Sequence, residues 1–353
     1  MATKIGTVEV DGVDVANAIR NSASEAYQNA VPRATGTNIQ DVGNPILNYQ
    51  SVQNEFLSAL VNKIAFTFVS NKMWDNPLSF LKKGAVPLGL DVEDIYTNPA
   101  IGADYEPDNF QGILIPETPD VKAAYYRRNR QTKYKVTIKN AQLQAAFTSW
   151  GNLESLIAAI VNSLYNGNTI GEFNLLKELV GSYTAAGKII QNVTPLPVDE
   201  ATSKAFMQKL RSVSYGMNFP SSAYNSYVRL GGDATKPVVN WSETSEQVII
   251  VRADVAASVD VQALAAAFNL SYQDYVAQQI IVDNFGPATN MFAMIADRKM
   301  FQIRENLRKM TEFFNGEVIA WTYWYHCWDT YALSPFENGV AFVTEEYPYT
   351  PGG

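Results

Sequence analysis

The most regular part of the chain runs from Leu143 to Gly167 and reads LQAAFTSWGNLESLIAAIVNSLYNG. Its apolar residues recur every three or four positions, which is the spacing of one helix face, and a second set of apolar residues flanks that face. A stripe this wide indicates a helix that is covered on more than one side. At 1.5 Å per residue the helix is roughly 35–40 Å long, and we expect Gly167 to end it.

A second helix is predicted directly after the first. Thr169 and Glu172 have the spacing of a capping box, which satisfies free backbone N–H groups at the start of a helix. Apolar residues then keep helical spacing as far as Gly187, so the two helices together form a long spine. Upstream, Ser51 is expected to cap a shorter helix, whose apolar face consists of Val52, Phe56, Leu60 and Ile64.

Residues 74–139 differ in character, because six prolines interrupt them and break any helix. Their charges are segregated: residues 91–120 hold eight acids and no base, and residues 121–139 hold seven bases and no acid. This pattern predicts an extended loop whose two limbs pair either with each other or with the opposite limb of another subunit. The candidate subunit contacts are Asp104, Glu106, Asp108, Arg127, Arg128, Arg130 and Lys133.

The start of the chain and its second half complete the organisation. Residues 1–50 carry a weak helical stripe that stops before Pro32, followed by a polar stretch, so we expect an arm across a neighbouring subunit or a disordered terminus. Beyond Pro197, strands alternate with helices, which indicates a compact α/β module. The expected elements are helices over 199–215, 263–268 and 272–278, and strands over 247–251, 279–285, 317–333 and 340–343.

The composition narrows the class of protein. The chain has 353 residues, of which 47% are hydrophobic and 18% charged, as is typical of a folded globular protein. Its net charge of −8 argues against tight wrapping of nucleic acid, whose phosphates are neutralised by Lys and Arg. Cys327 is the only cysteine, which excludes an intrachain disulfide and a cysteine-based zinc site. The N-terminus lacks the apolar core of a secretion signal, so we expect a soluble protein made inside the cell.

The sequence offers little for catalysis. His326 and Cys327 are neighbours in a predicted strand and point to opposite faces, so they cannot form a nucleophile–base pair with each other. We interpret His326 as a core side chain bonded to the backbone. No phosphate-binding or dinucleotide-binding motif is present, and we expect no catalytic residue, no cofactor and no metal site. The carboxylate pairs that would suit a hydrolase lie in polar stretches, which disfavours that alternative: Asp104 with Glu106, and Glu345 with Glu346.

The order of these segments resembles the Hong Kong 97-type shell fold of tailed phages and herpesviruses. Within that group the chain resembles the major head proteins of phi-29-like short-tailed phages, through stretches that follow in order over residues 15–345. Among these stretches are Val15-Ala-Asn-Ala-Ile-Arg-Asn-Ser22, Arg128-Asn-Arg-Gln131, Phe147-Thr-Ser-Trp-Gly-Asn-Leu-Glu-Ser155, Leu307-Arg-Lys-Met310 and Tyr323-Trp-Tyr-His326.

The resemblance implies an α+β fold with four parts. These are an N-terminal arm (1–50), an extended loop (74–139), a peripheral domain that carries the spine helix (51–73, 140–192 and 316–353) and an axial domain (193–315). The family's best-known member continues into an immunoglobulin-like domain, whereas this sequence stops at Gly353. We therefore expect no such domain here.

The resemblance also implies a function. It predicts a major capsid protein, not an enzyme, that self-assembles into pentamers and hexamers and forms the icosahedral or prolate head shell around double-stranded DNA. The implied partners are other copies of the chain, a scaffolding protein during assembly, a portal or connector at one vertex, and DNA held without sequence specificity, but no membrane. The protein would be assembled in the host cytoplasm and reside in the virion. The alternatives are a phage tail or receptor-binding protein and, less favoured, a carboxylate-based hydrolase.

Overall fold

The computed structural model describes residues 12–67, 74–102, 118–266 and 278–349, and the chain forms two compact units. The first unit comprises Met1–Asn76, Gln131–Glu172 and Leu307–Trp328, and the second comprises Pro77–Arg130, Phe173–Asn306 and Asp329–Gly353. Each unit has its own apolar core, so each is described by itself.

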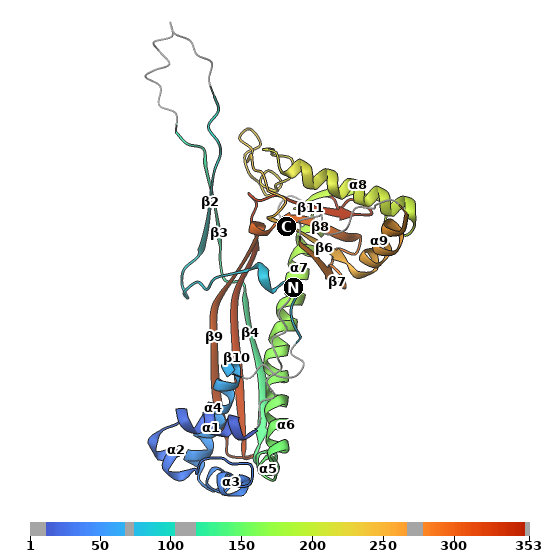
Figure 1. Cartoon of the computed structure of the whole chain (residues 1–353). Coiled ribbons are helices and arrows are strands. Elements are labelled where there is room, and N and C mark those ends of the chain that lie inside the picture. The colour runs from blue at the N-terminus through green and yellow to red at the C-terminus, as the bar shows by residue number, and fades with distance from the viewer. Residues whose placement is uncertain (1–11, 68–73, 103–117, 267–277, 350–353) are drawn as a thin grey trace. The chain divides into compact units, whose positions relative to one another are not determined.

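The first unit is built around helices from the start and the middle of the chain (Figure 1). Its core also takes side chains from β4 (Arg130–Lys139) and β10 (Ala320–Leu333), which alternate between the core and the opposite face as strands do. The helices are α1 (Gly12–Ser22), α2 (Glu25–Ala30), α3 (Ile39–Asn48), α4 (Gln50–Thr67), α5 (Asn140–Ala146) and α6 (Trp150–Val161).

Residues 12–50 pack into this core of their own chain, including Val42 of the predicted polar stretch, which is 1% exposed. Ile19 and Ile46 are at most 1% exposed. The polar backbone of the stretch is satisfied by α1: the Asn17 amide bonds the N–H and the carbonyl of Ala34 at 2.9 and 3.0 Å. The guanidinium of Arg20 donates to the carbonyl of Val31 at 2.8 Å. These side chains hold residues 28–34 against their own chain.

The predicted spine exists, but its breaks lie elsewhere. Residues 147–149 separate α5 from α6, and the Ser149 hydroxyl accepts a bond from the N–H of Asn152 at 3.2 Å. A π-helical turn (Asn162–Asn166) then leads directly into α7 (Gly167–Ala185), so the expected stop at Gly167 was wrong. The capping box was wrong too, because the Thr169 hydroxyl donates to the carbonyl of Tyr165 inside the continuing helix.

The start of α4 also differs from the prediction by two residues. The N–H of Gln53 donates to the carbonyl of Tyr49, which makes Tyr49 rather than Ser51 the residue that precedes the helix.

The second unit centres on a five-stranded sheet in the order β5-β11-β8-β6-β7 (Figure 1). β11 pairs with β5 in parallel and with β8 antiparallel, and β6 pairs with β8 antiparallel and with β7 in parallel. The strands are β5 (Ile190–Val193), β6 (Gln247–Arg252), β7 (Gln278–Val282), β8 (Met291–Asp297) and β11 (Gly339–Val343).

Both faces of this sheet are covered. Val248 and Ile250 of β6 face the cluster that contains Phe173 and Val180 of α7, whereas Ile249 and Val251 face the opposite cluster. That second cluster is formed with α8 (Glu200–Met217) and α9 (Ala253–Ala266), which pack against each other. The unit is therefore a helix–sheet–helix sandwich, as the α/β module predicts.

Several predicted elements are confirmed in this unit. Asp199 caps α8, accepting the N–H of Thr202 at 2.8 Å, and the strands over 247–251 and 340–343 correspond to β6 and β11. The helix over 263–268 was predicted too short, since α9 begins at Ala253. The predicted helix over 272–278 lies outside the described residues up to 277, and Gln278 begins β7.

A second sheet has the order β1-β9-β10-β4. β10 confirms the strand predicted over 317–333, but neither β9 (Phe301–Asn315) nor β8 was predicted. β1 (Lys82–Lys83) follows a 3-10 turn (Ser79–Leu81), and a second such turn (Arg298–Met300) precedes β9. Within the described ranges, no helix has the length and apolar character that a bilayer crossing requires.

Two glycines in the spine allow a matched test of the packing. A Cβ placed on Gly181 of α7 would overlap the backbone carbonyl oxygen of Phe285, whereas a Cβ on Gly151 of α6 meets no atom within 4 Å. We expect Gly181→Ala to lower the free energy of unfolding by at least about 2 kcal/mol, because backbone has to move. Gly151→Ala should leave it unchanged or raise it slightly. Urea unfolding of both variants checks this, and equal midpoints would contradict the close packing.

Candidate functional site

The extended loop forms a two-stranded ribbon from β2 (Val92–Thr97) and β3 (Val121–Tyr126). The strands pair antiparallel, from Val92 opposite Tyr126 to Thr97 opposite Val121. Side chains add to this pairing: the Tyr125 hydroxyl donates to Glu93 at 2.9 Å. At its described base, the acidic limb therefore pairs with the basic limb of the same chain.

The two faces of the ribbon differ. On one face Val92 is buried and Tyr96 half-buried. On the other face, the large side chains of Ile95, Val121 and Tyr125 are 57%, 54% and 63% exposed. The ribbon thus carries one face that is held by its own chain and one apolar face that is open in the single chain.

Two loops of the second unit hold the covered face, and we call them the ribbon seat (residues 237–240 and 334–338, with Tyr227). The Ser334 hydroxyl donates to Asp94 at 2.6 Å, and the Tyr96 hydroxyl donates to the carbonyl of Val239 at 2.6 Å. Asn98 completes the polar contacts, since its amide accepts the N–H of Val239 and donates to the carbonyl of Pro237, both at 3.0 Å.

Aromatic rings reinforce the seat. The rings of Tyr96 and Phe336 stack with centroids 6.0 Å apart, and Phe336 also meets Tyr227 at 6.0 Å. The ammonium of Lys122 lies 5.4 Å from the centre of the Tyr227 ring and bonds Asp120 at 2.7 Å. Stacked rings and directed hydrogen bonds together fix the base of the ribbon on this unit.

Two acids lie at the seat, the half-buried Glu337, which is part of it, and the buried Asp297. Glu337 accepts a hydrogen bond from the Asn240 amide at 3.0 Å. Burial, followed by the charge of Asp297, raises the pKa of Glu337 to about 7. Asp297 is 1% exposed and its pKa is likewise raised by burial, although its carboxylate accepts the N–H of Lys299 at 2.7 Å.

The structure separates the predicted contact residues. Arg130 is buried and pairs with Asp329 at 2.8 Å, with side chains 6% and 2% exposed. Arg127 is 85% exposed and pairs with Asp91 at 3.0 Å, and Arg128 and Lys133 are exposed. The remaining candidates lie outside the described residues: Asp104, Glu106 and Asp108.

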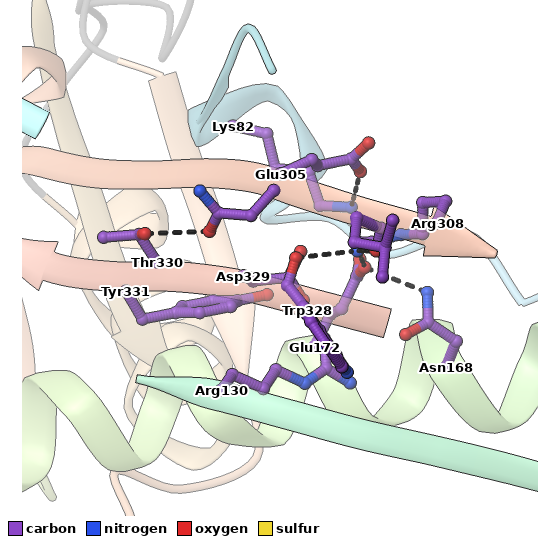
Figure 2. Close-up of polar contacts among 12 residues, drawn as sticks. Lys82, Arg130, Asn168, Glu172, Glu305, Arg308, Trp328, Asp329, Thr330 and Tyr331 are labelled. Atoms are coloured by element: carbon purple, nitrogen blue, oxygen red, sulfur yellow. Dashed lines mark hydrogen bonds and ion pairs between the residues drawn. The ribbon is translucent and has the colours of Figure 1, made fainter. Parts of the chain in front are cut away.

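Other charged pairs had no clear signal in the sequence (Figure 2). In the first unit, Arg308 bonds Glu172 at 3.0 Å, and the Asn168 amide donates to the same carboxylate oxygen at 2.9 Å. In the second unit, Lys82 pairs with Glu305 at 3.3 Å. Arg308 and Glu172 are far apart in the sequence, as are Lys82 and Glu305, so spacing does not reveal these two pairs. Asn168 and Glu172 lie on neighbouring turns of one helix, so spacing reveals only this contact.

The described residues position strands rather than reacting groups. His326 bonds the hydroxyl of Thr311 at 2.9 Å, not the backbone as predicted, and Cys327 is buried. Across the ranges that the structure describes, no three His, Cys, Asp or Glu side chains gather in a way that could hold a metal ion. The bonds of Ser334, Val239 and Asn98 hold the base of the extended ribbon in place.

Comparison with known proteins gives a consistent picture. The profile of a family described as Phi29-like phage major capsid protein matches residues 16–343. The chain is 34% identical to the major capsid protein of Bacillus phage PZA, over 98% of this chain and 75% of that protein. It is 27% identical to the major capsid protein of Streptococcus phage Cp-1, over 98% of this chain and the whole of that protein.

Solved structures agree at the level of the fold. The capsid structure of Staphylococcus phage Andhra matches with a TM-score of 0.63 at 15% identity, covering 80% of this chain and 88% of that one. At this identity the match speaks for the fold alone, which is the Hong Kong 97-type capsid fold expected from the order of the segments.

The buried pair and the exposed pair of the basic limb can be compared directly. Removing Arg130 leaves the buried carboxylate of Asp329 without its cation, and we expect Arg130→Ala to lower the free energy of unfolding by about 3–5 kcal/mol. Arg127→Ala, the matched control, should change it little, because both partners of that pair are solvated. Guanidinium unfolding of both variants checks this, and a stable Arg130→Ala protein would show that the buried pair contributes little.

Proposed function

Because this chain belongs to the family of Phi29-like phage major capsid proteins, we propose that its copies form the pentamers and hexamers of the head shell. The protein is a structural component of the virion that builds the phage head, and its family has no enzymatic function. The family match over residues 16–343 carries this conclusion. It also removes the alternatives of a tail protein and a hydrolase.

We further propose the partners that such a shell requires. A scaffolding protein directs assembly, a portal or connector occupies one vertex, and double-stranded DNA fills the interior. The net charge of −8 supports loose enclosure of DNA, since an acidic wall does not grip a phosphate backbone. The proposed parts of the subunit are the arm (1–50), the extended loop (74–139), the peripheral domain (51–73, 140–192 and 316–353) and the axial domain (193–315).

The open face of the ribbon supports contact with other copies. Ile95 and Tyr125 present apolar surface there, and Arg127, directly after β3, adds exposed positive charge. Apolar area with charges around it is typical of protein–protein interfaces. Arg127, Arg128 and Lys133 therefore remain proposed subunit contacts, whereas Arg130 stabilises its own chain.

The turn between β9 and β10 supports a second contact. Phe313, Val318 and Ile319 are 58%, 61% and 55% exposed there. Ile319 has a φ of 46°, a left-handed conformation that is costly for a β-branched residue. Exposed Glu317 and Lys139 flank this apolar turn with opposite charges, so the same turn on two copies is complementary.

Electron microscopy of the full chain, with and without its scaffolding partner, tests assembly. We expect closed shells, or sheets and tubes of hexamers, from the native chain. Val318→Asp should abolish them while leaving the thermal unfolding of the subunit unchanged, and Val318→Leu should assemble normally. A native chain that stays monomeric under both conditions would contradict self-assembly. Normal shells from Val318→Asp would contradict only the contact at the turn.

A further inference from the structure

We propose that a binding site for a hard divalent cation, Ca²⁺ or Mg²⁺, lies at the ribbon seat and is formed by side-chain oxygens of Asp297, Glu337 and Asn338. Carboxylate and amide oxygens are the protein ligands that such ions prefer. The proposal concerns a single subunit and goes beyond shell formation, so its test does not depend on assembly.

The amide of Asn338 provides the first observation. The residue is 0% exposed, and its Oδ1 is buried without a hydrogen-bond partner among the described residues. The Nδ2 of the same amide donates to the Ser242 hydroxyl at 3.2 Å, and that hydroxyl in turn is a hydrogen-bond donor to Asp297. A buried acceptor such as Oδ1 needs a water molecule or a cation as its partner.

The carboxylate of Asp297 provides a second, independent observation. Asp297 is 1% exposed, and within the described ranges no salt bridge neutralises it. Its backbone N–H donates to the carbonyl of Asn338 at 2.8 Å, which places the two residues side by side. The ammonium of Lys299 bonds Glu246 at 2.9 Å instead, and that of Lys83 donates to a backbone carbonyl. A carboxylate buried in this way stays ionised only with a cation beside it.

One short loop brings the third donor to the same place. Asn240 and Ser242 are two positions apart and both buried, so their side chains lie on the same side of the chain. Asn240 holds the Glu337 carboxylate at 3.0 Å, and Ser242 holds the Asn338 amide. The negative charge of Asp297 acts on Glu337. The set thus contains two acids that repel each other and an amide oxygen as the third donor, a combination that a divalent cation neutralises.

A cation in this site would stiffen the ribbon seat. It would join the end of β8, which carries Asp297, to the segment 334–338, which bonds and stacks on β2. Residues 237–240 would be fixed as well, because Asn240 bonds Glu337. The ion would therefore act on the support of the ribbon rather than on the ribbon itself.

Equilibrium dialysis of the chelator-treated full chain against CaCl₂ or MgCl₂, followed by metal analysis, tests the site. We expect about one ion of at least one of the two metals per chain, and a higher midpoint of thermal unfolding after its return. Hydrogen exchange should slow in residues 237–242 and 334–338 and stay constant in α1. A chain that retains neither metal would overturn the proposal, and so would an ion that binds without slowing exchange in these two segments.

A conservative variant makes the outcome specific to the site. Asp297→Asn can still accept the N–H of Lys299 but lacks the charge, so we expect it to bind the ion at least about tenfold more weakly. The matched control Glu345→Gln, which removes an exposed carboxylate just after β11, should bind like the native chain. If Asp297→Asn does not fold, Glu337→Gln provides the second measurement and should also weaken binding. Native affinity in the folded variant would contradict the site.

Discussion

The five-stranded sheet of the second unit is apolar on both faces, so it is stable only when both faces are covered. Met294 and Ala296 of β8 face the cluster formed with α7, and Ala293 and Ile295 face the cluster formed with α8 and α9. This constraint fixes where the helices lie and leaves the loops between strands at the edges. The ribbon seat consists of such loops, and its rigidity therefore derives from the covered sheet. An extended ribbon with little core of its own needs a support of this kind.

The elements that the sequence predicts correctly are those that depend on residues close to one another in the chain. Asp199 is visible in the sequence because it caps the helix that directly follows it. The apolar run of β6 is visible because both faces of this strand are covered. β9 was not predicted, because its charged residues interrupt the apolar alternation. Lys82 pairs with Glu305 of β9 over 223 positions of sequence, and no local pattern reveals such a partner.

Arg130 was predicted as a subunit contact, but its side chain is buried within its own chain. Arg130 lies in a run of bases that suggests solvent, yet Asp329, 199 positions away, makes its burial possible. The polar stretch after α1 is a further example, since Asn17 and Arg20 satisfy its backbone from another part of the chain. Buried polar groups need partners, and sequence spacing does not identify partners that the fold brings together.

The place of β11 in the sheet has a consequence for synthesis. β11 (Gly339–Val343) lies between β5 and β8, and it is the last strand of the described chain to leave the ribosome. Until it is translated, β5 has no neighbour in its sheet and the two apolar clusters lack the residues of β11. The sheet of the nascent chain therefore cannot be completed before β11 has been translated, and its apolar clusters stay partly open until then.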